Sequence, residues 1–575
     1  MKRSAAISER TASYVHGASS IPLRGITVGE LLSETSRRFP NNEALVVPYQ
    51  NIRWTYGELE LRVDQLAAGL LSIGLEPGDR IGVLAPNCAE WVLLQFATAR
   101  AGLILVNINP AYRLPELEFS LNQVEVKALV TVRQHKSSRY LDMLAELLPE
   151  LCDAQPGSLQ SSQIPSLRWV IEITDDIAEP CKLAGIVSLR EVMDRVAETD
   201  TIRLRELEDQ LQFDDPINIQ FTSGTTGRPK AATLTHHNIV NNAYFSGLRM
   251  ELSSNDRMCI PVPMYHCFGM VLGTLCCVAH GATIVFASAG FDAAAALQTV
   301  NDEKCTVFHG VPTMFIAALD IPGFDELDLT SLRTGIMAGA PCPAELMTRV
   351  MVDMHMSEIT IAYGMTETGP VSTQTSITDP LERRVETVGK VLPHTEIKIV
   401  DEENRVVPRG TAGELLTRGY CVMPKYWNDP EKTAKAIDDS GWIASGDIAT
   451  LDPEGYFQIV GRIKDMLIRG GENIFPREIE DFLYTHPAID QIEVIGVPDP
   501  VYGEEVCAWI KLREGKAVTA DQIRKFCNGK IAHFKIPKYI RFVNEFPMTI
   551  TGKVQKFMMR DIMAKELEAE ERAAS

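Results

Sequence analysis

The segment RIGVLAPNCAEWVLLQFATARAGLILVNINP (residues 80–110) decides the fold class. It opens with an apolar run at 80–86, continues with a helical pattern at 89–102 and ends with a second apolar run at 103–110. Two strands joined through a helix lie parallel in one sheet, because parallel pairing requires such a crossover connection. The segment therefore predicts a parallel sheet whose two faces are covered by helices.

The alternation of short apolar runs and helical patterns continues on both sides of this unit. Further strands are expected at ALVTV (128–132) and RWVIEI (168–173), and four more apolar runs lie between residues 282 and 364. From about residue 385 to 460 the helical patterns become sparse, which predicts a small β-rich subdomain.

A separate unit is expected at the C-terminal end of the chain. Beyond GRIKDMLIRGG (461–471) follow one amphipathic helix, two strands and a second helix, with a periodicity of their own. We therefore expect an α/β protein with a large N-terminal domain at 1–463 and a small α+β C-terminal domain at 464–575. The N-terminal domain would consist of parallel-type sheets flanked by helices, with the β-rich subdomain as part of it.

The net charge argues against nucleic acids and lipid head groups as partners, and the one long apolar window does not predict a membrane span. The 575 residues include 56 Lys and Arg against 76 Asp and Glu, a formal net charge of −20. A surface this acidic repels the phosphates of nucleic acids and of lipid head groups. The window GMVLGTLCCVAHGATIVFA (269–287) is long enough for a membrane span, but His280 and Gly281 interrupt it. It predicts a buried helix, a turn and a buried strand.

The cysteines favour a reducing compartment. The 12 cysteines include no CxxC pair, which argues against a zinc site and a disulfide framework. Cys305 and His309 stand four residues apart without a second such pair nearby, so we interpret both as core residues. The first residues, MKRSAAISERTASY, lack the apolar run of a secretory signal. These features predict the cytoplasm, with the mitochondrial matrix as the alternative.

Two motifs are suited to binding a nucleotide and its metal. FTSGTTGRPKAATLTHHN (221–238) follows an expected strand, and its glycines and hydroxyl residues let backbone amides converge on a phosphate, with Lys230 as an added cation. It is not a P-loop, because Pro229 stands where that motif has a glycine before the lysine. In YGMTETGP (363–370), Tyr363 offers a ring for a base and Glu367 a carboxylate for Mg²⁺.

Two later segments add charged groups. SGDIATLDPEGYFQIVGRIKD (445–465) has Asp447 and Arg462 near the ends of a hairpin-like stretch, where they suit the two hydroxyls of a ribose. PMTITGKVQKFMMR (547–560) carries Lys553 on a tight turn. Neither segment identifies a function alone, and their significance comes from the other motifs.

Taken in order, these motifs resemble the adenylate-forming superfamily of acyl-CoA synthetases, luciferases and peptide-synthetase adenylation domains. The resemblance rests on TSGTTGRPK (222–230), GAP (339–341), YGMTETG (363–369), SGD (445–447), GRIKD (461–465) and TGK (551–553). More narrowly, the chain is similar to acyl-CoA synthetase family member 2 and to bacterial fatty-acyl-CoA ligases. That similarity is carried by RGYCVMPKYW (418–427), IRGGENIFPREIEDF (468–482) and HFKIPKYIRFV (533–543).

The resemblance implies ATP, Mg²⁺ and coenzyme A as cofactors and a reaction in two steps. A carboxylic acid attacks the α-phosphorus of ATP to give an acyl-adenylate and pyrophosphate, the mobile C-terminal domain rotates, and the thiol of CoA displaces AMP. The implied nucleotide-binding residues are Thr222, Ser223, Gly224, Thr225, Thr226, Gly227 and Lys230 at the β- and γ-phosphates, Gly339, Ala340, Pro341, Tyr363 and Gly364 at adenine, and Asp447 and Arg462 at the ribose.

The implied catalytic residues are Lys553, Glu367, Thr366 and Lys230. Thr366 would contact the α-phosphate, Glu367 would bind Mg²⁺, and Lys553 would lie between the acid and the α-phosphate, where a cation offsets the repulsion of two anions. Lys464 would be the hinge of the rotation. Gly470 and Gly471 would leave room for the pantetheine arm of CoA.

The resemblance also locates an acid pocket. PMYHCFGMVLG (263–273) matches the acid-binding segment, with His266 as an aromatic gate and Phe268 beside it, and GVPTMFIAAL (310–319), with Met314, and GIMAGAP (335–341) are further walls. The first segment lacks the aspartate that amino-acid-activating relatives use, and the other two lack a Lys or Arg for a second carboxylate. An apolar monocarboxylic acid fits, and because each buried methylene contributes about 0.8 kcal/mol, pocket length would select the chain length.

The main hypothesis is a ligase that joins a fatty acid, expected to be of medium chain length, to CoA. An acyl-AMP ligase that loads a carrier protein and an aryl-acid CoA ligase are the alternatives. A luciferase-like oxygenase shares the first step, and a regulatory nucleotide-binding protein would be expected to lack Lys553 or Glu367. The sequence leaves open the chain length, the pathway and the oligomeric state, for which a homodimer is one candidate.

Overall fold

The protein is described by a computed structural model with two compact units. The described residues are 11–174, 183–222, 229–340, 342–470, 472–548 and 554–574. The larger unit comprises His16–Glu396 and Thr417–Ile443, and the smaller unit Met1–Val15, Ile397–Leu416 and Ala444–Ser575. The domain boundary expected at Lys464 stays a prediction.

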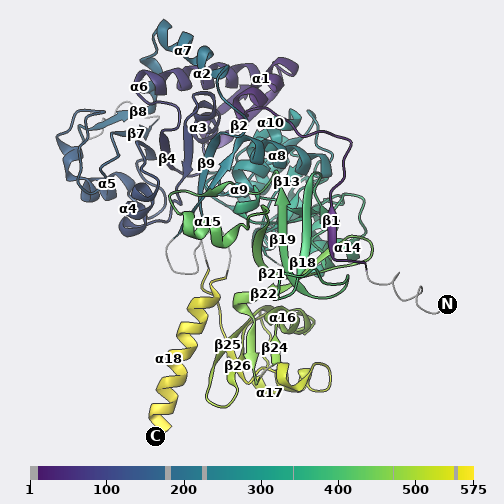
Figure 1. Ribbon diagram of the computed structural model, residues 1–575. Coiled ribbons are helices and arrows are strands. Elements are labelled where there is room, and N and C mark those ends of the chain that lie inside the picture. Colours follow the sequence, from purple (N-terminus) through teal and green to yellow (C-terminus); the bar gives the residue numbers. More distant parts are fainter. Residues whose placement is uncertain are drawn as a thin grey trace. The chain divides into compact units, whose positions relative to one another are not determined.

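An eight-stranded sheet forms the framework of the larger unit (Figure 1). Its order is β20-β10-β9-β5-β4-β6-β7-β8, and the six strands from β9 to β8 run parallel. The strands are β4 (Arg80–Leu84), β5 (Ile104–Asn107), β6 (Ala128–Val132), β7 (Trp169–Ile173), β8 (Ile186–Ser188), β9 (Pro216–Thr222), β10 (Lys230–Thr235) and β20 (Lys425–Tyr426). The parallel pairing of β4 with β5 across helix α3 (Ala89–Arg100) confirms the interpretation of residues 80–110.

Two further sheets complete the larger unit. The order β13-β11-β12-β2-β3 is parallel except at β3, and in β14-β15-β16-β17 only β14 and β15 are parallel. The strands are β2 (Glu43–Val47), β3 (Ile52–Thr55), β11 (Arg257–Cys259), β12 (Thr283–Val285), β13 (Val307–Phe308), β14 (Ile336–Ala338), β15 (Thr360–Tyr363), β16 (Thr373–Gln374) and β17 (Lys390–Val391).

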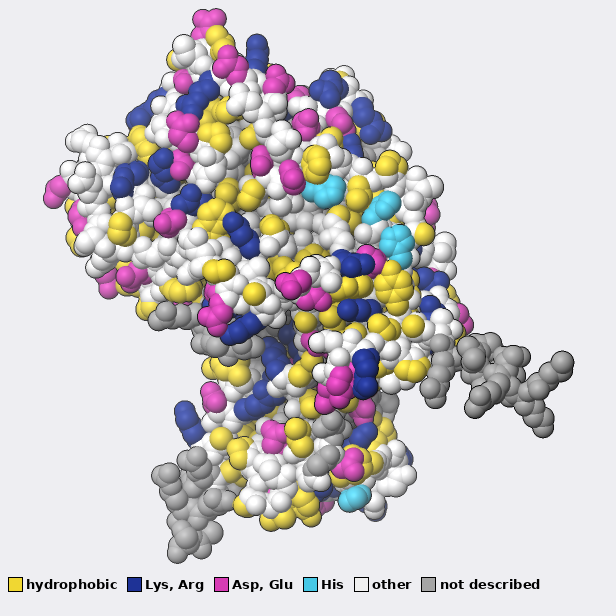
Figure 2. Space-filling model, in the orientation of Figure 1, with side chains coloured by type: hydrophobic (Ala, Val, Ile, Leu, Met, Phe, Trp, Pro, Cys, Tyr) yellow, Lys and Arg dark blue, Asp and Glu magenta, His cyan; other side chains and the backbone are white. Residues whose placement is uncertain are grey.

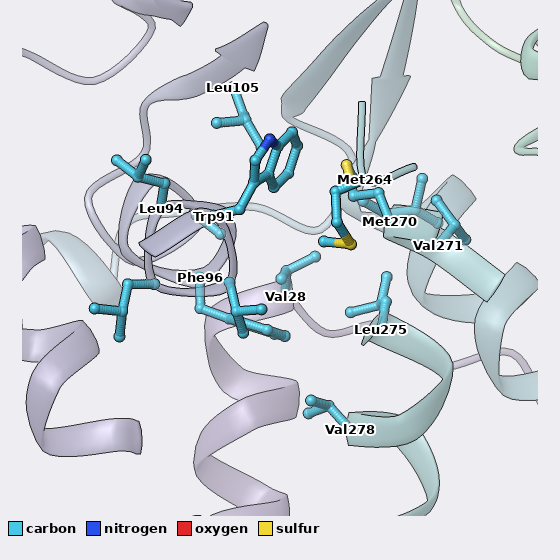
Figure 3. Packing of buried hydrophobic residues seen from close by; sticks show 14 of the residues in the cluster. Val28, Trp91, Leu94, Phe96, Leu105, Met264, Met270, Val271, Leu275 and Val278 are labelled. Carbon is cyan, nitrogen blue, oxygen red and sulfur yellow. The ribbon is translucent and has the colours of Figure 1, made fainter. Parts of the chain in front are cut away.

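Helices pack on these sheets with apolar faces. The longer ones are α1 (Val28–Arg38), α2 (Tyr56–Ser72), α4 (Leu114–Gln123), α5 (Tyr140–Leu147), α7 (Glu198–Glu208), α8 (His236–Arg249), α11 (Ala293–Glu303), α12 (Pro312–Leu319) and α13 (Ala344–Asp353). Trp91 and Phe96 of α3 are fully buried in the largest hydrophobic cluster. Figure 3 shows them beside Val28 and the apolar side chains of residues 270–278.

The apolar window 269–287 is the buried helix, turn and strand that the sequence predicts. After α9 (Cys267–Gly269), the helix continues through a π-helical turn at Met270–Leu275, called the π-turn below, and α10 (Cys276–His280). Gly281 adopts a left-handed conformation, and β12 follows. The π-turn is a departure from the regular helix that the pattern predicts. Among the described residues, no helix is both long and apolar enough to cross a bilayer.

The smaller unit contains most of one sheet and the whole of another. The orders are β1-β18-β19-β21-β22 and β24-β23-β26-β25, with β27 paired to β26. The elements are β1 (Tyr14–His16), β18 (Thr395–Val400), β19 (Gly413–Gly419), β21 (Ile443–Leu451), β22 (Phe457–Arg462), β23 (Leu467–Arg469), β24 (Glu472–Ile474), α16 (Pro476–Tyr484), β25 (Ile489–Asp499), β26 (Gly503–Leu512), α17 (Ala520–Cys527), β27 (Tyr539–Phe542) and α18 (Lys556–Ala574). Strands predominate between β18 and β22, as the sparse helical patterns predict.

Candidate active site

The carboxylate of Glu367 lies at the centre of a hydrogen-bonded group in the larger unit. It belongs to a short 3₁₀ turn (Thr366–Thr368) that follows the end of β15. The residue is 9% exposed. Its Oε1 accepts hydrogen bonds from the hydroxyl of Thr222 (3.1 Å) and from the hydroxyl of Tyr426 (2.8 Å). The fold therefore brings the expected metal ligand to Thr222, the first residue of the expected phosphate loop.

Strand pairing closes the base of that loop. Thr222 ends β9, Lys230 begins β10, and the two residues are directly paired across the antiparallel strands. The Lys230 ammonium lies 3.5 Å from the hydroxyl of Tyr426 and 4.9 Å from the centre of its ring. The loop residues between them, Ser223, Gly224, Thr225, Thr226 and Gly227, lie outside the described residues.

Tyr426 is a site residue that the sequence analysis missed. It is 3% exposed and contacts both Glu367 and Lys230. Burial, followed by the charge of Glu367, raises the pKa of Tyr426, so its hydroxyl remains a donor. Tyr426 reaches this place because β20 pairs with β10, with Tyr426 opposite Ala232. The segment 418–427, which contains it, carries part of the family resemblance. Pairing between strands this far apart in the sequence, however, leaves no local pattern that would predict the position of Tyr426.

The acid-binding segment meets the nucleotide motif at Cys267. The Cys267 sulfur lies 3.6 Å from Nδ1 of His266 and 3.7 Å from the hydroxyl of Thr366. The same Nδ1 accepts a hydrogen bond from the backbone N–H of Phe268 (3.1 Å). The buried thiol of Cys267 thus lies between Thr366, which is expected to contact the α-phosphate, and His266, the expected gate of the acid pocket.

The residues expected at adenine follow two neighbouring strand ends. β14 and β15 run parallel, so Gly339-Ala340 and Tyr363-Gly364 leave the same edge of the sheet, where ligands of parallel sheets bind. A side chain at Gly364 would place its Cβ 2.0 Å from the carbonyl oxygen of Pro370, so only glycine fits. Pro341 lies outside the described residues.

The expected ribose residues form an ion pair in the smaller unit. Asp447 and Arg462 are paired opposite each other in the β21–β22 hairpin, and Arg462 Nε donates to Asp447 Oδ1 at 2.7 Å. The Asp447 side chain is 6% exposed and that of Arg462 is 52% exposed, so the guanidinium is open to solvent on one side. This confirms the predicted hairpin geometry. The roles of both residues stay predictions.

The expected hinge and the CoA residues lie farther along the smaller unit. Burial, and then the neighbouring charge of Arg462, lowers the pKa of Lys464. The backbone N–H of Gly470 donates to the carbonyl oxygen of Tyr502 (2.9 Å), which fixes the turn after β23. Gly471 and Lys553 lie outside the described residues.

The oxygen donors around Glu367 suit Mg²⁺. This ion prefers carboxylate, hydroxyl, water and phosphate oxygens, and in nucleotide sites it commonly takes one or two carboxylates together with phosphates. Across the described part of the chain, no three or more His, Cys, Asp or Glu side chains gather as a metal cage. One carboxylate held by two hydroxyls beside a phosphate-binding loop therefore fits a Mg²⁺ ion shared with a nucleotide.

Comparison with known families identifies the fold. A family model described as AMP-binding enzyme matches residues 32–427. The chain belongs to the AMP-binding enzyme family. A second model, described as the AMP-binding enzyme C-terminal domain, matches residues 478–553. Membership of this family confirms the resemblance to adenylate-forming enzymes and the α/β fold class with a large N-terminal and a small C-terminal part.

Individual relatives cover nearly the whole chain. The medium-chain acyl-CoA ligase ACSF2 of Danio rerio, named as mitochondrial, is 49% identical over 560 residues, covering 97% of this chain and 91% of the relative. The putative acyl-CoA synthetase YngI of Bacillus subtilis is 48% identical over 536 residues, covering 93% and 96%. The crystal structure of ATP-bound MatB from Rhodopseudomonas palustris has a TM-score of 0.79 and 27% identity, covering 94% of this chain and 99% of that one.

In this AMP-binding enzyme two of the residues expected to line the acid pocket are apolar and buried. Phe268 and Met314 are 7% and 8% exposed and belong to one hydrophobic cluster, and His266 is half-buried at its edge. The outer surface is different, since acidic, basic and apolar side chains are intermixed on the face drawn in Figure 2. The polar group around Glu367 is therefore linked, through Thr366 and Cys267, to the buried hydrophobic cluster that contains Phe268.

Proposed function

We propose that the chain is an ATP-dependent, AMP-forming acid–thiol ligase that joins medium-chain fatty acids to coenzyme A. The acid and ATP first give an acyl-adenylate and pyrophosphate, and the CoA thiol then forms the thioester and releases AMP. One observation carries the proposal. The hydrogen-bonded group of Glu367, Thr222 and Tyr426 meets the expected acid-binding segment where Thr366, next to Glu367, contacts the buried thiol of Cys267.

Each side chain has a distinct part in the proposed first step. Mg²⁺, when bound, neutralises phosphate charge. Thr222 and Tyr426 orient the Glu367 carboxylate that would hold the ion, and Lys230 offers a cation to the outer phosphates. Lys553 would offset the repulsion between the acid and the α-phosphate. Asp447 and Arg462 would bind the ribose.

The second step uses residues of the smaller unit. Lys464 would be the hinge, and Gly470 and Gly471 would leave space for the pantetheine arm of CoA. Support for CoA as the acceptor comes from the relatives, which are named as acyl-CoA ligases or synthetases. A carrier protein in place of CoA, or an aryl acid in place of a fatty acid, would be an outcome of the test below.

The substrate class follows from what lines the pocket. The segments 263–273, 310–319 and 335–341 contain no Lys, Arg, Asp or Glu, so they suit an apolar tail with a single carboxylate at its end. The ACSF2 relatives are named medium-chain ligases, which supports the chain length proposed here.

The cellular compartment and the oligomeric state of the chain need tests of their own. The sequence favoured the cytoplasm over the mitochondrial matrix, but the vertebrate relatives are named as mitochondrial and give the cytoplasm no support. Fractionation of cells that express the chain distinguishes the two compartments. Sedimentation of the purified protein distinguishes a monomer from the homodimer considered above.

The direct test is release of pyrophosphate and AMP with ATP, Mg²⁺ and either benzoate or straight-chain acids from butyrate to palmitate, each with and without CoA. We expect AMP and acyl-CoA to form with CoA, with an optimum at medium length. Pyrophosphate release that CoA does not extend to turnover would indicate a carrier protein as the acceptor. Turnover of benzoate but of no fatty acid would replace the proposed substrate class.

Lys553→Ala separates the two steps. Because this lysine is proposed to act only while the acid meets the α-phosphate, the variant should lose adenylate formation but still form thioester from supplied acyl-adenylate. Gly471→Leu should do the reverse by obstructing the pantetheine arm. Lys565→Ala, at an exposed lysine of α18, is the matched control and should change neither step. Loss of the same step in Lys553→Ala and Gly471→Leu would contradict the two roles.

A further inference from the structure

One buried histidine contacts all three expected walls of the acid pocket. His309 is fully buried and directly precedes the wall 310–319. Its Nδ1 accepts a hydrogen bond from the backbone N–H of Ile336 (3.1 Å), in the wall 335–341. Its Nε2 therefore carries the proton and donates to the carbonyl oxygen of Leu272 (3.1 Å), in the wall 263–273. The sequence predicted a core residue, and the burial confirms this, but core packing does not account for both bonds.

The carbonyl that His309 holds belongs to the π-turn. In a π-helical turn the carbonyl groups bond to the N–H five residues ahead instead of four, an uncommon arrangement that side chains bonded to those carbonyls stabilise. His309 does this at Leu272. At Met270 the Gln95 side chain does the same, since its Nε2 donates to the carbonyl oxygen (3.1 Å) while its Oε1 accepts from the hydroxyl of Thr274 (2.6 Å). Gln95 and Thr274 are buried.

The π-turn is held in place on its other side by apolar packing. Figure 3 shows Met270, Val271 and Leu275 in the interior that also contains Trp91 and Leu94 of α3. If the turn became a regular α-helix, the residues on one side of it would rotate by about 100° relative to those on the other. Phe268 stands two residues before the turn, and its ring lies 5.6 Å from that of His309. His309 thus contacts both the turn and the wall residue whose position the turn determines.

We propose that His309 determines the acyl-chain length that the pocket accepts, by fixing the π-turn, Phe268 and the strand at Ile336 relative to one another. It is a positioning residue, since it acts through Phe268 and the backbone of the walls. The inference rests on the proposed function of the segments 263–273, 310–319 and 335–341 as pocket walls. A wall displaced by the length of one or two methylenes changes the preferred acid, because each methylene contributes about 0.8 kcal/mol.

The charge state of His309 agrees with this role. Burial lowers the pKa of His309 to about 4, so the ring is neutral at neutral pH and keeps one donor and one acceptor. A charged ring would have no acceptor for Ile336 N–H.

The test compares three substitutions that separate the two bonds. The amide nitrogen of His309→Gln can replace Nε2 and still donate to Leu272. His309→Asn is too short to reach Leu272, although its oxygen can replace Nδ1 as acceptor for Ile336 N–H, and His309→Phe loses both bonds. The readout is kcat/KM for each acid from butyrate to palmitate, beside KM for ATP and the thermal unfolding midpoint.

We compare kcat/KM for the best acid with kcat/KM for the acid that is two carbons longer. His309→Asn and His309→Phe should change this ratio by about tenfold and leave KM for ATP unchanged. His309→Gln, which keeps the bond to Leu272, should stay closer to the wild-type profile than the other two variants. Gln95→Leu removes the amide bond to the Met270 carbonyl oxygen, which the Thr274 hydroxyl also approaches at 2.8 Å, and should alter the profile even if a His309 variant fails to fold. The matched control is His280→Asn, at a histidine bonded to the carbonyl oxygen of Tyr244 (3.0 Å), which should lower stability without altering the profile.

An unchanged profile in the folded Asn and Phe variants and in Gln95→Leu would overturn the inference. So would an equal change in His280→Asn, because it would show that any loss of stability alters selectivity. A wild-type enzyme that turns over no straight-chain acid would instead overturn the proposed function. The two failures are therefore distinguishable.

Discussion

Around Glu367 the site is held by side chains, whereas around His309 it is held by backbone carbonyl and N–H groups. Glu367, Thr222 and Tyr426 exchange hydrogen bonds through their own functional groups. His309 and Gln95 instead donate to the backbone carbonyl groups of Leu272 and Met270. These bonds depend on the course of the backbone and not on the side chains at positions 272 and 270. Both regions lie in the larger unit, and they meet at Cys267.

Under the proposed function, this difference separates chemistry from selectivity within one site. A charged carboxylate that must bind a metal needs particular atoms, so the residue types around it are restricted. A pocket for an alkyl chain needs only apolar surface at the right distance, and that distance depends on backbone geometry. Substitutions in the first region should therefore change metal and ATP dependence, and substitutions in the second should change which acid is used.

The largest effect is expected for Glu367→Gln. The amide keeps the shape of the side chain but removes the charge proposed to hold Mg²⁺, so adenylate formation should fall by about 10²–10³-fold. Raising the Mg²⁺ concentration should not restore the rate, and the residual activity should keep the wild-type chain-length profile. Pyrophosphate release measures both, with Glu382→Gln at an exposed carboxylate as the control. A rate within a factor of about two of wild type would exclude Glu367 as the metal ligand.

A second effect concerns stability in acid and involves the buried ring of His309. The pKa of His309 is lowered from 6.5 to about 4, so its neutral form stabilises the fold fully above about pH 6.5, and this contribution is lost as the pH falls toward 4. Between pH 7.5 and pH 5 the loss is about 2 kcal/mol in the free energy of unfolding. Denaturant unfolding of the wild type and of His309→Gln at pH 7.5 and pH 5 measures it. An equal loss of stability in both proteins would contradict this assignment.

The smallest effect is expected for Tyr426→Phe, which tests the Glu367 region. Loss of the hydroxyl leaves Glu367 with Thr222, so the Mg²⁺ concentration for half-maximal rate should rise by about tenfold, because a hydrogen bond to a charged group contributes about 1.5–3 kcal/mol. The acid profile should not change. Tyr140→Phe is the matched control, since this buried hydroxyl donates to the carbonyl oxygen of Pro110 (2.8 Å) away from the site. An unchanged Mg²⁺ requirement would mean that Thr222 alone orients the carboxylate.

The sequence was sufficient to predict the fold and the motifs that carry the chemistry, because both depend on local sequence patterns. The crossover at 80–110 and the turn at Gly281 were predicted from periodicity and from glycine, and Asp447 and Arg462 from their places in one hairpin. Tyr426 was missed because its role depends on the pairing of β20 with β10, strands far apart in the chain. The π-turn was missed because its residues fit a regular buried helix equally well, and the partners of its carbonyls come from α3 and from His309.

The measurement that tests the account most directly places both regions in one experiment. Wild type, Tyr426→Phe, His309→Asn and the double variant are compared for Mg²⁺ dependence and for kcat/KM across the acids. If metal binding and chain-length selection are separate, each single variant changes one property, and the double variant combines both changes without further interaction. If either single variant alters both properties, or the two effects do not combine independently, the division between a side-chain site for the metal and a backbone-held site for the acid is wrong.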